Sequence, residues 1–479
     1  MSIPRLLATA ALTSLAFLAV TCTSEEPTAP AAAGGSGAVT PYDPYRVVLT
    51  SELKPTRGLQ PHRATIHLHS VYSHDACDEK GFTDTSGKQN YKEGTRNEEC
   101  FEDLRRALCE SGQDVAFLTD HVGHYPDFEY PEVLLYKQGD TLIEKGGKPV
   151  ANRLACPQGR SVLVYAGIDY SVIAVGLDGH AGATPEERKT IYGKKTPEAV
   201  DALKKAGALV LAGYVRRWVE DGDVETLHAL PFDGIEVYNP IFNMKDRAGD
   251  ILNFVLKLKD APETLPSPEL ALYTVFEETQ ETLKQWALLA PKRRLPSFLG
   301  ANAHQNVFQQ KSPDGERIDS YRRMLHWFSN HLLLPEGTQL TIDGAKQAIR
   351  EGHSYAVFDY LGTPEGFEWR AEAGGKAVDM GGAIEAPASL VARAPAVFGL
   401  GSADEPPVIT VRILRASGET WEEVASGQGE VAVPTAPPGV YRSEVRILPN
   451  HLKPHLGNEP SRFLREVIWI YGNTIHVGT

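Results

Sequence analysis

Residues 65–75 read TIHLHSVYSHD, and the motif TDH stands at residues 119–121 after a second apolar run. In a β-strand residues i and i+2 lie on the same face, so His67 and His69 can point at one metal ion. His121 ends the second run in the same way. An isolated His-x-His is also compatible with chance histidines on a surface strand. Two strands that both end in metal-ligand residues instead predict a metal site at the carboxyl ends of barrel strands.

The chain has 479 residues and a formal net charge of −14 at pH 7. This length accommodates two or three domains with a sizeable core. The negative charge disfavours nucleic acid and anionic membrane surfaces as partners, and we expect no nucleic-acid binding. An acidic balance is also what clustered ligands for cations would produce.

Residues 1–22 resemble an export signal. Arg5 precedes an apolar run that is too short for a dedicated membrane span, and Cys22 follows this run. Such a cysteine resembles that of a bacterial lipoprotein signal, in which Cys22 would be acylated and anchor the protein to a membrane. Thr21 departs from the usual Ala, Gly or Ser, so soluble export and an uncleaved anchor stay open. We expect an exported protein of the bacterial cell envelope or periplasm, with a lipid anchor as the favoured form.

The remaining chain divides into three regions by composition. Residues 23–45 are rich in Ala, Pro, Gly, Ser and Thr and predict an unfolded tether. In residues 46–361 apolar strands alternate with helical patterns, which predicts a parallel sheet covered by helices, with closure into a barrel favoured. Residues 362–479 contain short β segments between turn clusters and predict a C-terminal β-sandwich.

Individual elements follow from apolar periodicity and helix-capping residues. We expect strands at 64–69, 115–118, 161–166, 208–212, 232–238, 297–301, 354–358, 408–414, 430–433, 440–447 and 465–470. We expect helices at 98–111, 196–207 and 344–351, and a mostly helical region at 252–289.

Four cysteines follow the tether: Cys77, Cys100, Cys109 and Cys156. An even number in an exported protein predicts one or two disulfides, and Cys77 and Cys100 would bracket a loop rich in Gly, Lys, Asn and Glu. Four free thiols are the alternative. Because the sequence contains no Cys-x-x-Cys pair, we do not expect these residues to bind zinc.

Further strand ends carry ligand-type residues. Asp169 ends the third strand, His180 follows after a short hairpin, and Asn302 and His304 end a late strand. Carboxylate and imidazole ligands together suit Zn²⁺, Mn²⁺ or Fe²⁺ better than Ca²⁺ or Mg²⁺. Two ions bridged by a carboxylate can generate hydroxide at neutral pH and bind a phosphate or a carbonyl.

The order of these motifs resembles the PHP (polymerase and histidinol phosphatase) superfamily, and within it the branch of CehA/McbA-like metallohydrolases. Residues 232–239 match a mid-domain strand, and residues 348–355 match the segment that closes the barrel. Residues 439–442 and 469–475 match an appended β-domain. The resemblance implies an α/β fold, with a distorted (β/α)7 barrel followed by a C-terminal β-sandwich.

The resemblance also implies a metal-dependent hydrolase that acts on small-molecule esters, above all phosphoesters, through a metal-bound hydroxide. It would hold one to three Zn, Mn or Fe ions per chain. The implied metal ligands are His67, His69, Asp75, His121, Asp169, His180 and His304.

The implied roles differ among these residues. His67 and His69 would bind one ion, and His121 and His304 a second, with a further ligand from His74 or Asp75, of which we favour Asp75. Asp169 would bridge two ions, and His180 would serve a third position. Asp120 would orient a ligand or join that third position. Arg216, with Arg217 beside it, would steady the developing anion, although a solvated helix face is as compatible with both arginines.

Three positions depart from the family pattern. Asp169 stands where Glu is usual, Gly213 and Tyr214 stand where a His-Pro pair follows Ala, and Asn302 replaces an Asp. The second ion position is therefore the best preserved. A catalytically degenerate relative that binds an ion or an anionic ligand at the cell envelope is the alternative function. A third possibility is an exported sugar- or protein-binding scaffold whose histidines bind no metal. We expect Glu236, on a barrel strand, to pack or support a ligand rather than bind metal.

Overall fold

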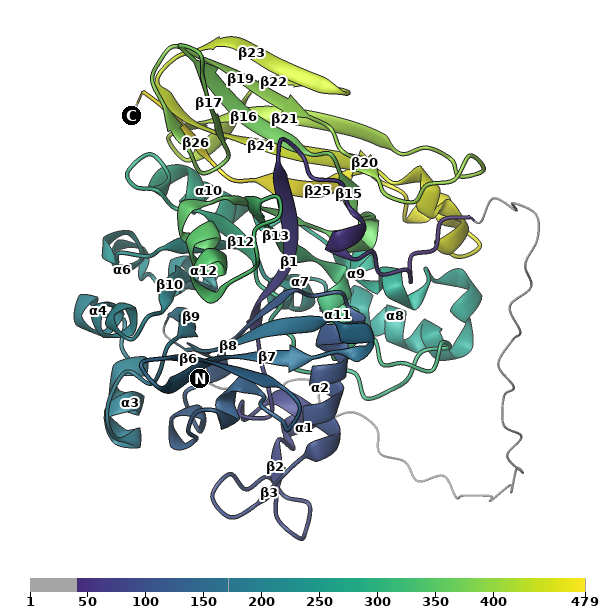
Figure 1. Cartoon of the computed structure of the whole chain (residues 1–479). Helices are drawn as coiled ribbons and strands as arrows, with labels where there is room; N and C mark the ends of the chain where they lie inside the picture. Colours follow the sequence, from purple (N-terminus) through teal and green to yellow (C-terminus); the bar gives the residue numbers. More distant parts are fainter. Residues whose placement is uncertain (1–40, 171, 479) are drawn as a thin grey trace. The chain divides into compact units, whose positions relative to one another are not determined.

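The computed structural model describes residues 41–170 and 172–478 (Figure 1). The predicted export signal and most of the predicted tether lie outside the described residues. From Pro41 onward the chain forms one compact unit. None of the helices in this described part is long and apolar enough to cross a membrane.

Two sets of parallel strands form the centre of a mixed α/β sheet. The first set is β1 (Leu59–Leu68), β4 (Val115–Leu118) and β8 (Ser161–Asp169). The second set is β10 (Leu209–Ala212), β11 (Gly234–Tyr238) and β12 (Ser297–Leu299). β9 (Ile173–Leu177) lies between the two sets and is antiparallel to both of its neighbours, β8 and β10. The expected strands are present, but the expectation of a parallel sheet is wrong at this strand.

Further antiparallel strands extend the sheet at its first set. β13 (Ser329–Pro335) pairs with β1 and with β14 (Ser354–Val357). The hairpin of β6 (Thr141–Lys145) and β7 (Lys148–Ala155) pairs with β8. Of these strands, the sequence predicted only β14. These antiparallel pairings make the sheet mixed.

The chain after β12 returns to β1 and brings two distant motifs together. Ala301 N donates to Ile66 O at 2.9 Å, and Asn302 N donates to His67 O at 2.6 Å. His69 N in turn donates to Ala303 O at 3.1 Å. Within the described residues β12 and β1 share no continuous ladder, so closure into a barrel stays a prediction.

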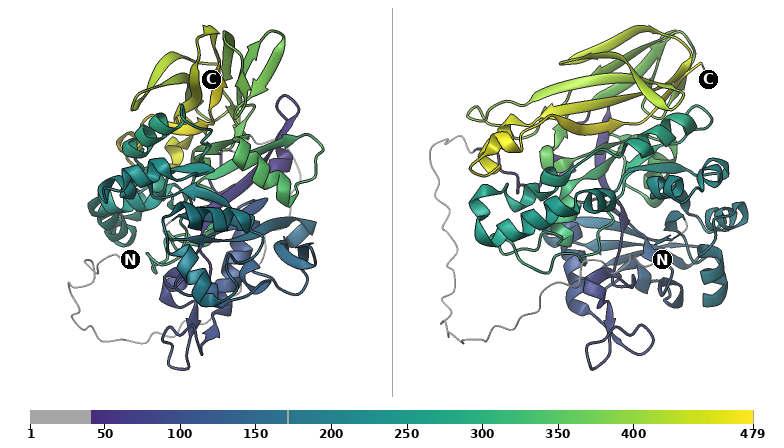
Figure 2. Two further views of the ribbon diagram at one scale, coloured as in Figure 1. Left: turned by 90° about the vertical axis from the view of Figure 1, so that its left-hand side faces the viewer. Right: turned by 180° about the vertical axis from the view of Figure 1, so that it is seen from behind.

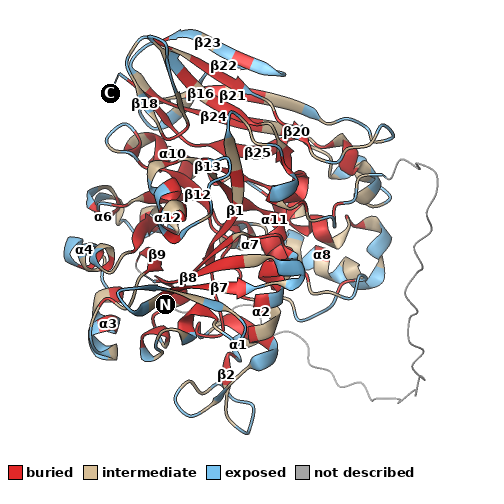
Figure 3. Ribbon diagram, in the orientation of Figure 1, coloured by how far each residue is buried: buried red, intermediate tan, exposed pale blue. Residues whose placement is uncertain are grey.

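Helices connect the strands and cover the sheet. α2 (Glu98–Glu110) begins at Asn97, whose side chain accepts from Cys100 N, and it buries Phe101 and Leu104 against the core. The other predicted helices are α4 (Pro197–Lys205) and α12 (Ile342–Glu351), and the helical region contains α8 (Ala248–Asp260), α9 (Ala271–Val275) and α10 (Gln280–Leu289). Figure 3 shows the central strands buried and the outer helix faces exposed.

The C-terminal residues form two β-sheets, which lie together at one end of the unit (Figures 1 and 2). One sheet has the order β17 (Lys376–Asp379), β16 (Glu368–Ala373), β19 (Ala388–Arg393) and β23 (Glu430–Ala436). The other contains β22 (Thr420–Gly427), β21 (Val408–Ser417), β24 (Gly439–Leu448) and β25 (Val467–Gly472). All four predicted strands are present. β25 also pairs with β14, which joins this second sheet to the central one, and the boundary at residue 362 stays a prediction.

Both pairs of cysteines form disulfides, Cys77–Cys100 and Cys109–Cys156. The expected pairing of Cys77 with Cys100 is therefore confirmed, and four free thiols are excluded. The two bonds link residues that are 23 and 47 positions apart in the sequence.

Candidate metal centre

Six of the seven predicted ligands come together at the carboxyl ends of β1, β8 and the short strand β5 (Asp120–His121) and in the segment after β12. Together with His74 they form three overlapping groups: His67, His69 and Asp169; His69, His121 and His304; and His74, Asp75 and His121. Within each group one ligand atom per residue lies within 4.8 Å of the others. His69 and His121 each belong to two groups, so the groups make one continuous centre.

His67 reaches the centre through an irregular backbone. It has a left-handed conformation with φ of 65°, and the pairing of β1 with β4 shifts register at this residue. A non-glycine residue in this conformation lowers the folding stability by about 1–3 kcal/mol, which the hydrogen bonds between β1 and β4 on either side must offset. Gly300 makes room opposite, since a Cβ there would lie 1.8 Å from Glu236 Oε1 and 3.1 Å from His67 Nδ1. The simple alternation of a strand therefore does not describe His67 and His69.

Backbone carbonyls fix the tautomers of two histidines. His121 Nδ1 lies 3.1 Å from Asp169 O, and His304 Nδ1 lies 2.9 Å from Asn302 O. Because a carbonyl oxygen can only accept, we assign the proton to Nδ1 in both rings. Nε2 is then the nitrogen of each ring that can bind a metal ion once it carries no proton, and the two Nε2 atoms are 3.5 Å apart and lie 3.3 and 3.5 Å from Asp75.

Asp120 fixes the tautomer of His69 through Ser73. Ser73 Oγ donates to Asp120 Oδ1 at 2.9 Å and lies 2.9 Å from His69 Nδ1, which must therefore be the donor. Ser70 N and Ser70 Oγ both donate to Asp120 at 2.7 Å. Asp120 belongs to none of the three ligand groups, and burial raises its pKa to about 6. Asp120 thus sets the tautomer of His69 that leaves Nε2 without a proton, although the Asp120 carboxylate belongs to none of the ligand groups.

The charge states of the four histidines differ. Burial lowers the pKa of His304 to about 4 and that of His69 well below its ordinary value, so both rings are neutral at pH 7. Burial also acts on His67 and His121, but the carboxylates around them outweigh it and raise their pKa values to about 10 and about 9. In the metal-free chain these two imidazolium rings supply positive charge that a divalent cation could replace.

Three ligand atoms of the centre are buried and make no hydrogen bond within the described part of the chain: His69 Nε2, Asp75 Oδ1 and Asp169 Oδ1. A buried polar atom without a partner costs about 1–3 kcal/mol. A cation would satisfy all three atoms, and nitrogen and oxygen ligands together suit Zn²⁺, Mn²⁺ or Fe²⁺. The residues therefore fit a divalent transition-metal ion.

Tyr214 and Glu236 complete the centre, and no role of Tyr214 in it was predicted from the sequence. Tyr214 Oη lies 3.0 Å from His67 Nε2, 2.9 Å from Asp169 Oδ2 and 3.1 Å from Asn302 Oδ1. Glu236 Oε1 lies 2.6 Å from His67 Nδ1, which agrees with the expected supporting role of this carboxylate. The available signal was the departure just after β10, where Gly213 and Tyr214 stand in place of the His-Pro pair of the superfamily that the sequence resembles.

His180 is not brought to the centre. Its Nδ1 lies 3.0 Å from Tyr192 Oη and its Nε2 lies 2.8 Å from Phe128 O, so both ring nitrogens have partners in the protein. The physical reason is the direction of β9, which precedes His180. Because β9 is antiparallel to β8, its carboxyl end lies at the opposite edge of the sheet from Asp169.

Arg216 also lies apart from the ligands. Its guanidinium pairs with Glu220 and Asp246 on the surface. Its neighbour Arg217 instead lies over the ring of Tyr214, 5.0 Å from the centroid. Of the two arginines considered from the sequence, Arg217 is therefore the one that lies beside the centre.

A small pocket opens beside Asp169 and Tyr214. Arg217, Lys195, Trp218 and Tyr170 line its other sides, among other residues. The Lys195 ammonium lies 4.3 Å from the Trp218 ring centroid and 2.9 Å from Asp223. The pocket thus places two cationic groups and aromatic walls beside Asp169 and Tyr214 of the candidate centre.

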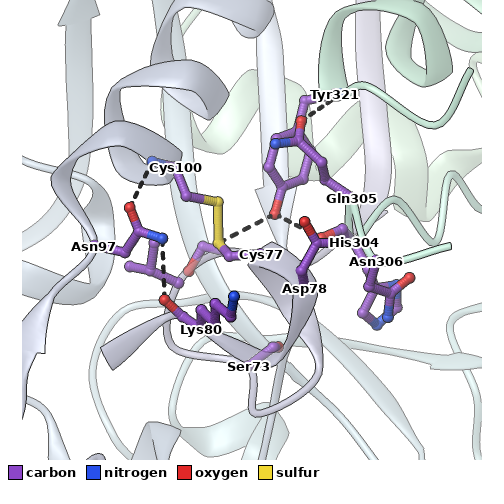
Figure 4. The surroundings of a disulfide bond; sticks show 12 residues. Ser73, Cys77, Asp78, Lys80, Asn97, Cys100, His304, Gln305, Asn306 and Tyr321 are labelled. Carbon is purple, nitrogen blue, oxygen red and sulfur yellow. Dashed lines mark hydrogen bonds between the residues drawn. A yellow bond between two sulfur atoms is a disulfide. The ribbon is translucent and has the colours of Figure 1, made fainter. Parts of the chain in front are cut away.

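The Cys77–Cys100 disulfide fastens the segment that carries Asp75 (Figure 4). Cys77 N donates to His304 O at 2.9 Å, and Tyr321 Oη donates to the same carbonyl at 3.1 Å. Asn306 Nδ2 donates to Asp75 O at 2.8 Å. The disulfide therefore begins two residues after the candidate ligand Asp75, and the backbone N–H of its Cys77 donates to the backbone carbonyl of the candidate ligand His304.

No protein-family model matches the sequence, and no curated protein matches it either. Among solved structures, the chain is similar to a protein from Bacteroides vulgatus described as a two-domain protein containing a predicted PHP-like metal-dependent phosphoesterase. The two are 11% identical, with a TM-score of 0.31, over 88% of this chain and 98% of the other. A TM-score this low does not establish a shared fold, so that description belongs to the other protein.

Proposed function

We propose that this chain is a metal-dependent hydrolase of ester bonds, and specifically a phosphoesterase. One observation carries the proposal: His69, His121 and His304 lie together beside Asp75 and Asp169, and each of these carboxylates has a buried oxygen that makes no hydrogen bond with a described residue. Each imidazole has its other nitrogen fixed by a protein oxygen, the usual arrangement around catalytic metal ions.

When bound, a Zn²⁺, Mn²⁺ or Fe²⁺ ion would lower the pKa of a water molecule and stabilise negative charge on oxygen. The chain's own residues supply the binding and the orientation. Arg217 and Lys195 would hold the anionic part of the ester in the pocket beside Asp169. Asp75 has 30% of its side chain exposed and lies beside His121, so the centre is open to solvent water at this residue.

We further propose that the protein is exported, with Cys22 as the site of a lipid anchor in the cell envelope. The two disulfides support export, because such bonds persist in oxidising compartments. A small-molecule ester is the proposed partner.

A second candidate function is a protein that keeps an ion or binds an anionic ligand without turnover. The specific observation in its favour is the filling of the region between His67 and Asp169 by the Tyr214 hydroxyl. The neutral amide of Asn302 beside it also reduces the negative charge available to a second cation.

Hydrolysis assays of the full chain loaded with Mn²⁺ or Zn²⁺ test the proposal. We expect turnover of a phosphomonoester or phosphodiester such as p-nitrophenyl phosphate or bis-p-nitrophenyl phosphate, and a loss of at least about 100-fold in His121→Ala and His304→Ala. His353→Ala is the control, because His353 is 45% exposed and belongs to none of the ligand groups. A bound ion without turnover of any ester would favour the second candidate, and the absence of a bound ion would contradict the hydrolase proposal and the ion-binding form of the second candidate.

A further inference from the structure

The ligand atoms of the centre divide into two halves that differ in hydrogen bonding. We call the inner half His67 Nε2 and Asp169 Oδ2, and the outer half Asp75 with the Nε2 atoms of His69, His121 and His304. In the inner half, both atoms are already in contact with the Tyr214 hydroxyl. In the outer half, His69 Nε2 and Asp75 Oδ1 make no hydrogen bond with any described residue.

The hydroxyl of Tyr214 lies between the two inner ligand atoms. His67 Nε2 and Asp169 Oδ2 are 3.4 Å apart, and Tyr214 Oη is 3.0 Å from the first and 2.9 Å from the second. The three atoms form a nearly equilateral triangle. An ion bound by nitrogen and oxygen ligands needs contacts of about 2.0–2.2 Å, so a hydroxyl in this place competes for the same space.

The surrounding residues hold Tyr214 in this place. Glu236 contacts His67 Nδ1 at 2.6 Å with one oxygen and accepts from Tyr214 N at 2.8 Å with the other. Tyr214 itself has a left-handed backbone with φ of 48°, which turns its side chain at the end of β10. The preceding residue provides no ligand, because Gly213 has no side chain, and Ile173 Cδ1 lies 2.1 Å from where its Cβ would be.

We propose that the Tyr214 hydroxyl takes the place of a metal ion in the inner half, and that the chain therefore binds one ion, in the outer half. This inference rests on the proposed metal centre. The hydroxyl hydrogen satisfies Asp169 Oδ2 in place of a cation, while Asp169 Oδ1 makes no hydrogen bond with any described residue. Tyr214 is thus a positioning residue that sets the number and the place of the ions.

Equilibrium dialysis of the full chain against Zn²⁺ or Mn²⁺, followed by elemental analysis, tests the inference. We expect one ion per wild-type chain and a second ion in Tyr214→Phe or Tyr214→Ala, because either change frees His67 Nε2 and Asp169 Oδ2. Tyr170→Phe is the matched control: Tyr170 lines the same pocket, is 51% exposed and has no hydroxyl contact with the ligands. This control should retain one ion.

Other outcomes separate this inference from the proposed function. Two ions in the wild type, or the loss of the bound ion in both Tyr214 variants when their circular dichroism spectra are unchanged, would overturn the inference and leave the hydrolase proposal standing. A new visible absorption band in the Fe³⁺-loaded wild type that is absent from Tyr214→Phe would identify Tyr214 as a ligand and also overturn it. No ion in the wild type would contradict the metal centre itself.

Discussion

Ser73 Oγ donates a hydrogen bond to Asp120 Oδ1 at 2.9 Å, and Ser73 Oγ also accepts a hydrogen bond from His121 N at 3.0 Å. Together with its contact to His69 Nδ1, this hydroxyl links a fully buried carboxylate to two candidate metal ligands. Asp120 therefore acts on the centre indirectly: through Ser73 it sets the orientation of His69 and His121 and the tautomer of His69.

Replacement of Asp120 by Asn should weaken metal binding without removing a ligand. The neutral amide oxygen accepts the hydrogen bond from Ser73 Oγ more weakly than the carboxylate does, so the tautomer of His69 is held less firmly. We expect the affinity for Zn²⁺ to fall about 10–100-fold, as for other residues that support metal ligands. Competition with a chelating dye measures this affinity. Asp201→Asn is the control, since its carboxylate is 61% exposed, and equal affinities in both variants would contradict the role of Asp120.

Metal affinity should rise with pH because a proton competes for His121. The pKa of this ring is raised to about 9 in the metal-free chain, so the ring is protonated at pH 7 and must release a proton to bind an ion. Affinity should then increase by up to about tenfold per pH unit toward pH 9. Calorimetric titration in buffers of different ionisation enthalpy should detect the release of about one proton. An affinity that does not change between pH 7 and 9 would contradict this assignment.

The pair of His67 and Glu236 should stabilise the metal-free protein. The pKa of His67 is raised from 6.5 to about 10, so its contribution to stability is complete below pH 6.5 and is lost as the pH rises through 10. Glu236→Gln should lower the free energy of unfolding at pH 6 by about 3 kcal/mol, because it leaves a buried imidazolium without its nearest anion. Urea denaturation at pH 6 and pH 10 measures both effects. The exposed Glu225→Gln should change neither value, and an equal loss in the two variants would refute the role of this pair.

The two disulfides should differ in their effect on metal binding. Removal of either pair by Cys→Ser changes should lower the free energy of unfolding by about 3–4 kcal/mol, from the loops of 23 and 47 residues that they close. Only the loss of Cys77–Cys100 should also weaken metal binding, because Cys77 N bonds to His304 O. The Cys109–Cys156 double variant is thus the matched control. Equal metal affinities in both folded double variants would show that the first disulfide does not support the centre.

The sequence was most informative where a short apolar run ends in a polar residue. β4 and β10 are each a run of four apolar residues, which is the pattern expected of a buried strand, and both strands were predicted. β13 was missed because it begins with the polar residues Ser329 and Asn330. The direction of β9 could not be predicted from its composition, since parallel and antiparallel buried strands have the same apolar character.

The same limits apply to the candidate centre. The residue types and the strand ends led to His67, His69, Asp75, His121, Asp169 and His304, which the fold brings together. His180 was misplaced because its position depends on the direction of β9. Tyr214 was missed because a tyrosine at a strand end is ordinarily a core residue, and only its contacts with His67 and Asp169 distinguish it.

The location of a bound ion tests the central claim most directly. Crystals of the full chain soaked in Zn²⁺ should show anomalous difference density between His121 Nε2, His304 Nε2 and Asp75, at about 2.0–2.2 Å from these ligands. Parallel crystals of His121→Ala should lose this density. The absence of anomalous density at this cluster in the wild type, with Zn²⁺ in the soaking solution, would contradict a metal centre in this protein.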